Sequence, residues 1–164
     1  MSDGIAVDAS KLDAILVDFL GLIDDPAPLL RVAAEEGAVH AIKKKFDVSG
    51  PGWKELAPLT LLNRRGGEGK PLQDTGALMN SILAGDPSGD SVDVGTNLIY
   101  AALQNFGGTV TPKSPPALRV PAGPGAFLSL QSVTIPARPF LDLTDEDVED
   151  IAGTIEDFLR LRWQ

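Results

Sequence analysis

The stretch Gly-Gly-Glu-Gly-Lys-Pro at residues 66–71 has the residue types of a phosphate-binding loop. Such a loop places a glycine four residues before Gly-Lys-Ser/Thr, follows a strand and opens a helix, so that backbone N–H groups surround the phosphates. Here the spacing is too short, Pro71 stands where a hydroxyl side chain is needed, and no strand-forming run precedes it. The stretch therefore predicts a loop, and we expect no nucleotide cofactor.

Side chains that ligate metals are present, but they lack the spacing of a metal site. His40 is the only histidine and there is no cysteine, so a zinc site cannot be completed around it. The acidic run 142–150 lacks the Asp-x-Asp-x-Asp-Gly pattern of a calcium loop. Asp86, Asp90 and Asp93 flank a turn, where aspartate is common because it hydrogen-bonds the backbone. We predict no metal site.

Catalytic chemistry has equally little support. No nucleophile-elbow sequence accompanies the serine, histidine and aspartate residues that a catalytic triad would need. Carboxylates could pair as acid and base in any acidic chain, and nothing distinguishes one pair. Trp53, Tyr100 and Phe106 could stack on nucleic-acid bases, but they are not interleaved with lysine or arginine. Core packing is the better interpretation, and we predict no catalytic residues and no cofactor.

The net charge of −9 argues against binding nucleic acid by phosphate neutralisation. The charge is uneven, because residues 1–50 carry −4, residues 51–140 carry +1 and residues 141–164 carry −6. Lysines 43–45 with arginines 64–65 could form a local basic patch, although a solvated helix end is the commoner meaning. The two ends of the chain are therefore acidic and its middle is nearly neutral.

The sequence gives no sign of export or of a membrane partner. The N-terminus is acidic and polar, unlike a signal peptide. The best apolar stretch, residues 14–23, is interrupted by Asp18 and is too short to span a bilayer. The absence of cysteine fits a reducing cytoplasm. We expect a single domain over residues 1–164, with 43% hydrophobic residues to form its core.

Helices are predicted at both ends of the chain. Ser10 can cap a first helix, and a second is expected over about residues 26–46, starting at a proline suited to the first turn. Small residues beside its apolar stripe predict that another element approaches closely. Thr144 with Asp147 forms a capping box for a last helix. The predicted buried stripe of that helix is Val148, Ile151, Ile155, Phe158 and Leu159.

The middle of the chain predicts shorter elements. A short helix broken at Pro58 is expected between residues 53 and 65, and Asp74 can cap a helical turn. Residues 81–84 and 91–95 predict a hairpin. A further helix, residues 98–106, has its apolar residues at helical spacing and ends at a left-handed glycine; the stripe is Ile99, Ala102, Leu103 and Phe106.

The proline-rich segment 109–126 predicts a loop or an extended arm. Residues 118–120 and 127–135 could pair as strands around it, and residues 1–9 are expected to be flexible. The expected fold class is α+β, with a small antiparallel sheet and long helices packed on one face.

Four blocks of the sequence occur in an order and at separations that resemble a known family. They are GWKELAPLT (52–60), LQDTGALMNSI (72–82), VGTNLIYAALQNFGG (94–108) and IPARPFLDLTDEDVEDI (135–151). Together they are similar to the virion morphogenesis, or tail completion, proteins of Mu-like tailed phages and prophages. The resemblance covers roughly residues 30–160 and implies an α+β fold without enzymatic activity.

The resemblance also implies a place and partners. Such a protein would act in the virion at the head–tail neck, after assembly in the bacterial host cytoplasm. It would complete or terminate the tail as a homo-oligomeric ring, expected to be a hexamer, between the tail tube protein and head-side neck proteins. DNA would pass through the ring without sequence recognition. Two alternatives stay open: an assembly chaperone or adaptor that binds another virion protein transiently, and a hydrolase using acidic residues.

The matched blocks and the arm supply candidate residues for a subunit or partner interface. We expect these contacts to involve Asp74, Thr75, Tyr100, Phe106, Gly107, Gly108, Arg119, Arg138, Pro139 and Phe140. Arg138 is a cation between two prolines, and its guanidinium could meet a carboxylate of the 142–150 run in a neighbouring subunit. The alternative is a bond from Arg138 to a backbone carbonyl of its own chain.

Overall fold

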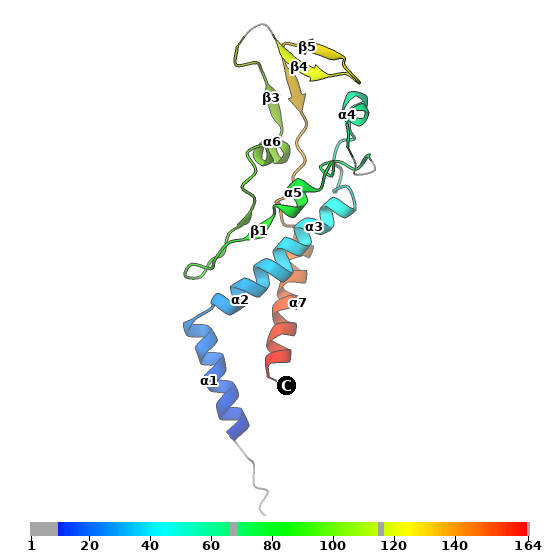
Figure 1. Ribbon diagram of the computed structural model, residues 1–164. Coiled ribbons are helices and arrows are strands. Elements are labelled where there is room, and N and C mark those ends of the chain that lie inside the picture. The colour runs from blue at the N-terminus through cyan, green and yellow to red at the C-terminus, as the bar shows by residue number, and fades with distance from the viewer. Residues whose placement is uncertain (1–9, 66–68, 115–116, 164) are drawn as a thin grey trace, which may run out of the picture.

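The computed structural model describes residues 10–65, 69–114 and 117–163 (Figure 1). The predicted flexible segment 1–9 and residues 66–68 of the glycine-rich loop lie outside these residues. The helices are α1 Ser10–Asp24, α2 Ala27–Val32, η1 Ala33–Ala38, α3 Val39–Asp47, α4 Pro58–Leu62, α5 Ala77–Asn80, α6 Ala101–Phe106 and α7 Asp145–Arg162. The strands are β1 Leu83–Ala84, β2 Val94–Gly95, β3 Gly108–Val110, β4 Leu118–Pro121, β5 Phe127–Leu130 and β6 Val133–Ile135.

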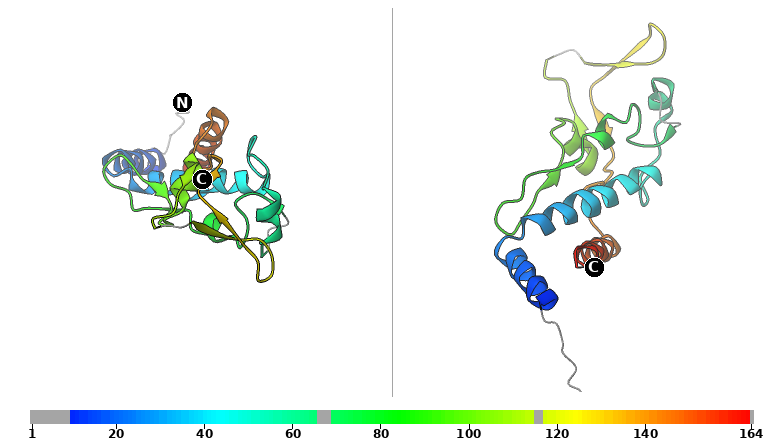
Figure 2. Two further views of the ribbon diagram at one scale, coloured as in Figure 1. Left: turned by 90° about the horizontal axis from the view of Figure 1, so that it is seen from above. Right: turned by 60° about the horizontal axis from the view of Figure 1, so that its bottom comes forward.

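The spine of the molecule is the run α2–η1–α3, which confirms the helix predicted over residues 26–46 (Figure 1). Its middle, η1, is a π-helix, which the sequence analysis did not anticipate. The predicted close approach occurs there, because α7 packs across η1 (Figure 2). A Cβ placed on Gly37 would lie 2.9 Å from Cγ1 of Ile151, so only glycine fits at this crossing without a shift.

The start of α7 is held by two sets of contacts. The Thr144 Oγ1 accepts from the Asp147 N–H at 3.2 Å and the Asp147 carboxylate accepts from the Thr144 N–H at 2.8 Å, which confirms the capping box. The same carboxylate lies 3.0 Å from Nζ of Lys45 in α3, and the ammonium also donates to the Asp142 carbonyl. The predicted buried stripe of α7 is only half-buried, and Val148 is exposed, because α7 rests on one helix.

The hydrophobic core lies where the C-terminal end of α3 meets α5, α6 and the segment before α7. Phe46, Phe140, Ile42 and Ile82 are fully buried. The Phe46 ring meets the Trp53 ring edge-on with centroids 5.6 Å apart, a geometry that adds to the gain from burial. Burying each such side chain stabilises the fold by roughly 1.5–3 kcal/mol.

The strands form three antiparallel pairs of two strands rather than one sheet, and the α+β class is confirmed. The predicted hairpin exists, with β1 and β2 shortened to two residues each. β4 pairs with β5, which confirms the expected pairing for residues 118–120 with residues 127–130. The rest of the predicted strand, β6, pairs instead with β3, a pairing that was not predicted. We call residues 108–135 the strand extension, because they project from the upper end of the spine (Figure 1).

Two local predictions were wrong about which residue starts a helix. Pro58 does not break a helix but begins α4, where its missing N–H costs nothing. Gly76, with φ of 76°, precedes α5 instead of an Asp74 cap, because the Asp74 carboxylate is bound to Arg65. Within the described part of the chain, no helix combines the length and apolarity needed to cross a membrane.

Candidate functional site

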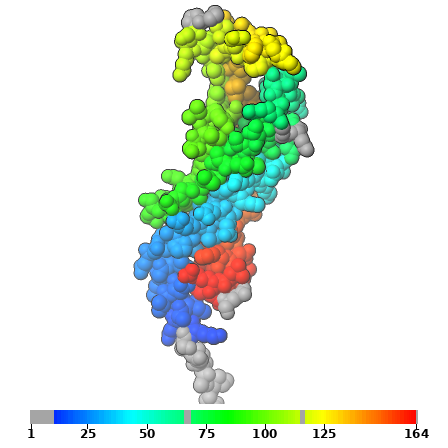
Figure 3. Space-filling model, in the orientation of Figure 1, coloured from blue at the N-terminus to red at the C-terminus, as the bar shows by residue number. Residues whose placement is uncertain are grey.

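A cleft of about 1040 Å³ opens between the segment that carries α4 and the strand extension (Figure 3). Its apolar lining comes from both sides, namely Leu56, Leu59, Leu130, Val133 and Ile135. The amide of Asn63 donates to the Pro121 carbonyl at 2.8 Å and so ties α4 to β4. The cleft is therefore a built feature of the fold, walled by segments far apart in the sequence.

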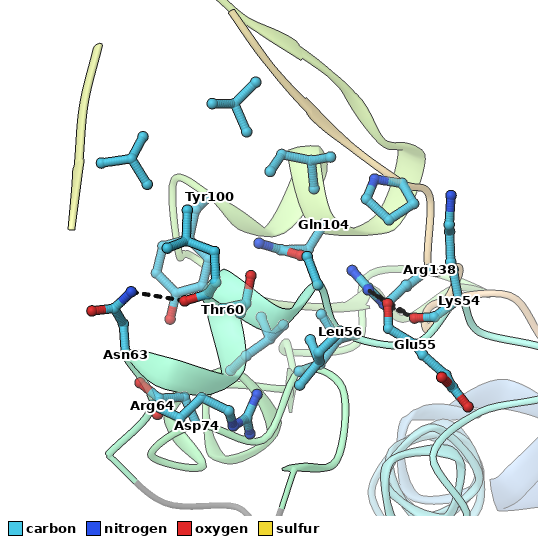
Figure 4. A pocket seen from close by; sticks show the side chains of 18 of the residues that line it. Lys54, Glu55, Leu56, Thr60, Asn63, Arg64, Asp74, Tyr100, Gln104 and Arg138 are labelled. Atoms are coloured by element: carbon cyan, nitrogen blue, oxygen red, sulfur yellow. Dashed lines mark hydrogen bonds between the residues drawn. The ribbon is translucent and has the colours of Figure 1, made fainter. Parts of the chain in front are cut away.

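Basic groups dominate the charges around this cleft (Figure 4). Its charged lining residues are Lys54, Glu55, Arg64, Arg65, Asp74 and Arg138, which makes four cations against two anions. Arg65 donates to Asp74 through its backbone N–H at 2.7 Å and its guanidinium at 3.0 Å. These bonds hold the pKa of Asp74 below its usual value, the backbone bond most strongly. In a chain with net charge −9, this cleft is lined by more basic than acidic side chains, although Arg65 is paired with Asp74 and Arg138 is buried.

Arg138 positions one wall of the cleft. Its side chain is buried, and its guanidinium donates to the Lys54 carbonyl at 3.0 and 2.8 Å and to the Glu55 carbonyl at 3.3 Å. Its backbone N–H donates to the Gln104 carbonyl at 2.9 Å. Burial lowers the pKa of the guanidinium below its usual value. Of the two alternatives, the bond to carbonyls of its own chain is the one seen.

Asn105 is a structural residue that the sequence analysis missed. Its side chain is buried in α6, and its Oδ1 accepts from the backbone N–H groups of Phe140 at 2.9 Å and Leu141 at 3.2 Å. Nearby, Trp53 Nε1 donates to the Pro139 carbonyl at 3.0 Å. These bonds satisfy the backbone of an irregular, buried segment that no strand partner covers. The sequence contained one signal for this role: Asn105 is a polar residue four positions after Ala101, and so it lies on the same, inner face of the helix.

The apolar stripe expected to anchor α6 faces outward instead. Ile99, in the turn before α6, is 99% exposed and Phe106 is 76% exposed, while Leu103 is half-buried. Ala101 and Asn105 form the buried face of the helix. The prediction assumed that the larger apolar side chains would point to the core. The core at this point admits only a small residue and a hydrogen-bonding amide, so the outer face of α6 is left uncovered.

Gly107 ends α6 as predicted, with φ of 69°. A Cβ there would lie 2.6 Å from the backbone nitrogen of Ala137, so the chain turns into β3 at Gly108 only with glycine. Phe106, Gly107 and Gly108 therefore form one corner between the body and the strand extension.

The structure brings together only part of the candidate set. Asp74, Thr75, Tyr100 and Arg138 all line the cleft. Arg119 lies on β4 with its guanidinium 4.5 Å from the centre of the Phe127 ring, and it is not among the cleft's lining residues. Phe140 is fully buried and Pro139 is exposed. His40 is exposed, and no cluster of potential metal ligands occurs among the residues that the structure describes.

Comparison with known proteins agrees with the resemblance of the four blocks. Residues 7–160 match the phage virion morphogenesis family. The chain is 38% identical over 137 residues to the Mu-like prophage FluMu G protein 2 of Haemophilus influenzae, which covers 82% of this chain and 79% of that protein. No solved structure is significantly similar to it. The chain is a member of the phage virion morphogenesis family.

Proposed function

We propose that this protein is a structural, non-enzymatic part of a phage particle that completes or terminates the tail at the head–tail neck. It works by self-assembly into a closed ring, expected to be a hexamer, placed between the tail tube protein and the head-side neck proteins. Membership of a virion morphogenesis family and similarity to a Mu-like prophage protein support a role in the particle. The ring and its position are our inference.

The observation that carries the proposal is the outward apolar face of α6. Ile99, in the turn before α6, and Phe106, at the end of the helix, are large apolar side chains that no described part of the chain covers, and exposed apolar surface of this kind marks interaction sites. A standard protein interface buries about 800 Å² on each partner, with apolar groups at its centre. The exposed stripe supplies such a centre, and a heterologous contact between copies then closes a ring or runs on as a filament.

The net charge of the chain bears on how the proposed ring would interact with DNA. A chain with net charge −9 does not attract phosphates over most of its surface. A neutral or acidic lumen lets DNA pass without being held. Tight binding of duplex DNA that weakens steeply with salt would contradict this part of the proposal.

The first experiment combines light scattering with electron microscopy of the purified protein. We expect ring particles whose population rises with concentration, and we expect the double variant Ile99→Ser/Phe106→Ser to shift them to monomer. Its melting temperature should stay close to that of the parent, because both side chains are exposed. Val48→Ser is the matched control, since Val48 is 67% exposed but lies at the end of α3. A parent that is monomeric at every concentration would refute self-assembly.

The second experiment places the protein in the particle. A phage that lacks the gene should give a lysate with unjoined heads and tails, and the protein should be found in purified virions. A protein required for assembly yet missing from finished virions would favour the chaperone or adaptor instead.

A further inference from the structure

Helix α1 is apolar on more than one face. A helix that is hydrophobic all round is normally buried on all sides. Among the described residues, α1 contacts α2 and the end of α7, and most of its large apolar side chains are exposed. The face of α1 away from these contacts is therefore an apolar surface against which we expect a partner to pack.

The covered face packs on the end of α7. Leu22 is buried, and the Phe19 ring lies 5.7 Å from the Trp163 ring, centroid to centroid. The Asp18 carboxylate accepts from the Arg162 guanidinium at 2.5 and 2.7 Å and from Trp163 Nε1 at 2.8 Å. These contacts fix the orientation of α1 and decide which side chains point outward.

The uncovered face carries a continuous apolar stripe. Leu12, Leu16, Leu20 and Ile23 recur at helical spacing, with exposures of 57%, 49%, 58% and 61%. Asp13 and Asp24 flank this stripe and are exposed. The surface that covers it should therefore be apolar in the middle and basic at the edge.

The cleft is such a surface. Its lining joins apolar side chains with an excess of cations, among them Lys54, Arg64 and Arg65. The cleft volume of about 1040 Å³ leaves room for several leucine-sized side chains, such as those on the outer face of α1.

A cleft in the same molecule cannot receive its own α1. The helix hangs from the lower end of the spine, while α4 and the strand extension stand at the upper end (Figures 1 and 2). Pairing of two α1 helices is also disfavoured, because acidic residues on α1 and the acidic α7 beside it would repel their copies.

We propose that α1 of one copy docks in the cleft of the next copy. The contact joins the lower end of one molecule to the upper end of its neighbour, so it is heterologous and repeats until a ring closes. Leu16 and Leu20 contact the apolar floor, while the carboxylates of Asp13 and Asp24 lie toward the basic rim. The inference rests on the proposed function and names the partner of the cleft.

The absence of cysteine from the chain gives this inference a direct test. Leu20→Cys places a thiol on the outer face of α1, and Thr60→Cys places one among the residues that line the cleft. Oxidation of the full-length double variant with oxidised glutathione should produce a ladder of disulfide-linked oligomers that ends at the ring size. A one-to-one mixture of the two single variants should give a heterodimer.

The matched control replaces the cleft cysteine with Ser88→Cys. Ser88 is exposed at the tip of the β1–β2 hairpin, away from the cleft. The pair Leu20→Cys/Ser88→Cys should form no ladder. If rings are seen by microscopy and the cleft pair gives no ladder, the docking is wrong while the ring proposal stands. If the parent stays monomeric, the ring proposal fails as well.

A second readout separates the apolar and charged parts of the contact. Leu16→Ser/Leu20→Ser should weaken association at least about 100-fold, because two apolar side chains lose their burial. Asp13→Lys/Asp24→Lys should weaken it by about 3–10-fold, more at low salt than at high salt. Helix content and melting temperature should stay unchanged in both variants. Association as tight as in the parent for the leucine variant would overturn the inference.

Discussion

Arg162, at the end of α7, donates two hydrogen bonds to the carboxylate of Asp18 in α1, and the Trp163 indole donates a third to the same carboxylate. Residues 144 positions apart in the sequence are joined by this ion pair. Together with the Phe19–Trp163 ring contact it fixes α1 against the body. The orientation of the outer face of α1 therefore depends on a charge that acid can remove.

Acid should release α1 from α7. The bonds from Arg162, and next that from Trp163, lower the pKa of Asp18 from 3.8 to about 2. A carboxyl group whose pKa is depressed by folding stabilises the fold above its unfolded pKa, so this contribution is complete above 3.8 and is lost between 3.8 and about 2. The indole N–H resonance of Trp163 should shift across that window. In Asp18→Asn it should already be shifted at neutral pH, and a parent-like titration in that variant would contradict the assignment.

Replacing Arg138 should destabilise the body. Arg138→Ala leaves the carbonyls of Lys54 and Glu55 without their buried donor, which costs about 2–4 kcal/mol. Arg138→Lys keeps the charge but loses the planar fork, so its cost should be intermediate. Urea unfolding measures both. An unchanged midpoint for the alanine variant would show that the wall of the cleft does not depend on this guanidinium.

The contributions of Lys45 and Asp147 to the free energy of unfolding should be coupled. Both side chains are nearly buried, so removal of one partner leaves an unpaired charge and should cost about 3–5 kcal/mol. Lys45→Met/Asp147→Asn should cost less than the sum of the single changes, with an interaction energy of at least about 1 kcal/mol. Glu146→Gln, at an exposed position in the same first turn of α7, is the control and should stay within about 0.5 kcal/mol of the parent.

Gly37 should not tolerate a side chain while Ile151 faces it. Alanine would gain about 1 kcal/mol of helix propensity, but its Cβ would clash with a β-branched side chain that has little freedom to move. We expect Gly37→Ala to lower stability by about 1–2 kcal/mol net. In the double variant Gly37→Ala/Ile151→Ala, the smaller side chain at position 151 should restore part of the stability lost in Gly37→Ala. Thermal unfolding of Gly37→Ala, Ile151→Ala and the double variant measures this. Simple additivity of the two changes would contradict the clash.

The part of the strand extension beyond the Val110–Val133 pair should be dispensable for folding. Val110 pairs with Val133, so the residues between them can be replaced by a two-residue Asn-Gly turn. No member of the hydrophobic core lies in the removed part. The shortened protein should fold as a monomer and assemble poorly, because β4 and β5 contribute one wall of the cleft. Loss of cooperative unfolding would instead assign these strands to the core.

The sequence predicted those elements whose signals are local. The capping box at Thr144, the glycine stop at Gly107 and the apolar period of the spine depend on neighbours within one or two turns, so a single pattern identifies them. The π-helix has no such signal. It coincides with the crossing of α7 at Gly37, and a contact between residues more than a hundred positions apart leaves no periodicity to detect.

The cleft could be predicted only in part. The resemblance directed attention to Asp74, Thr75, Tyr100 and Arg138, which the fold does place together. The basic character of the cleft depends on which strands pair above α4. That pairing joins segments far apart in the sequence, so no local pattern predicts it. The error on α6 has a different origin, because an apolar stripe indicates burial without saying whether the cover belongs to the same chain.

The packing of α7 on η1 also bears on synthesis. One side of the spine stays open until the eighteen residues of α7 have been made, since α7 follows η1 by more than a hundred residues in the sequence. A product of premature termination lacks that helix together with the Lys45 partner, and we expect it to be too unstable to persist. We expect cellular proteases to degrade such incomplete chains, because the side of the spine that α7 covers stays exposed in them.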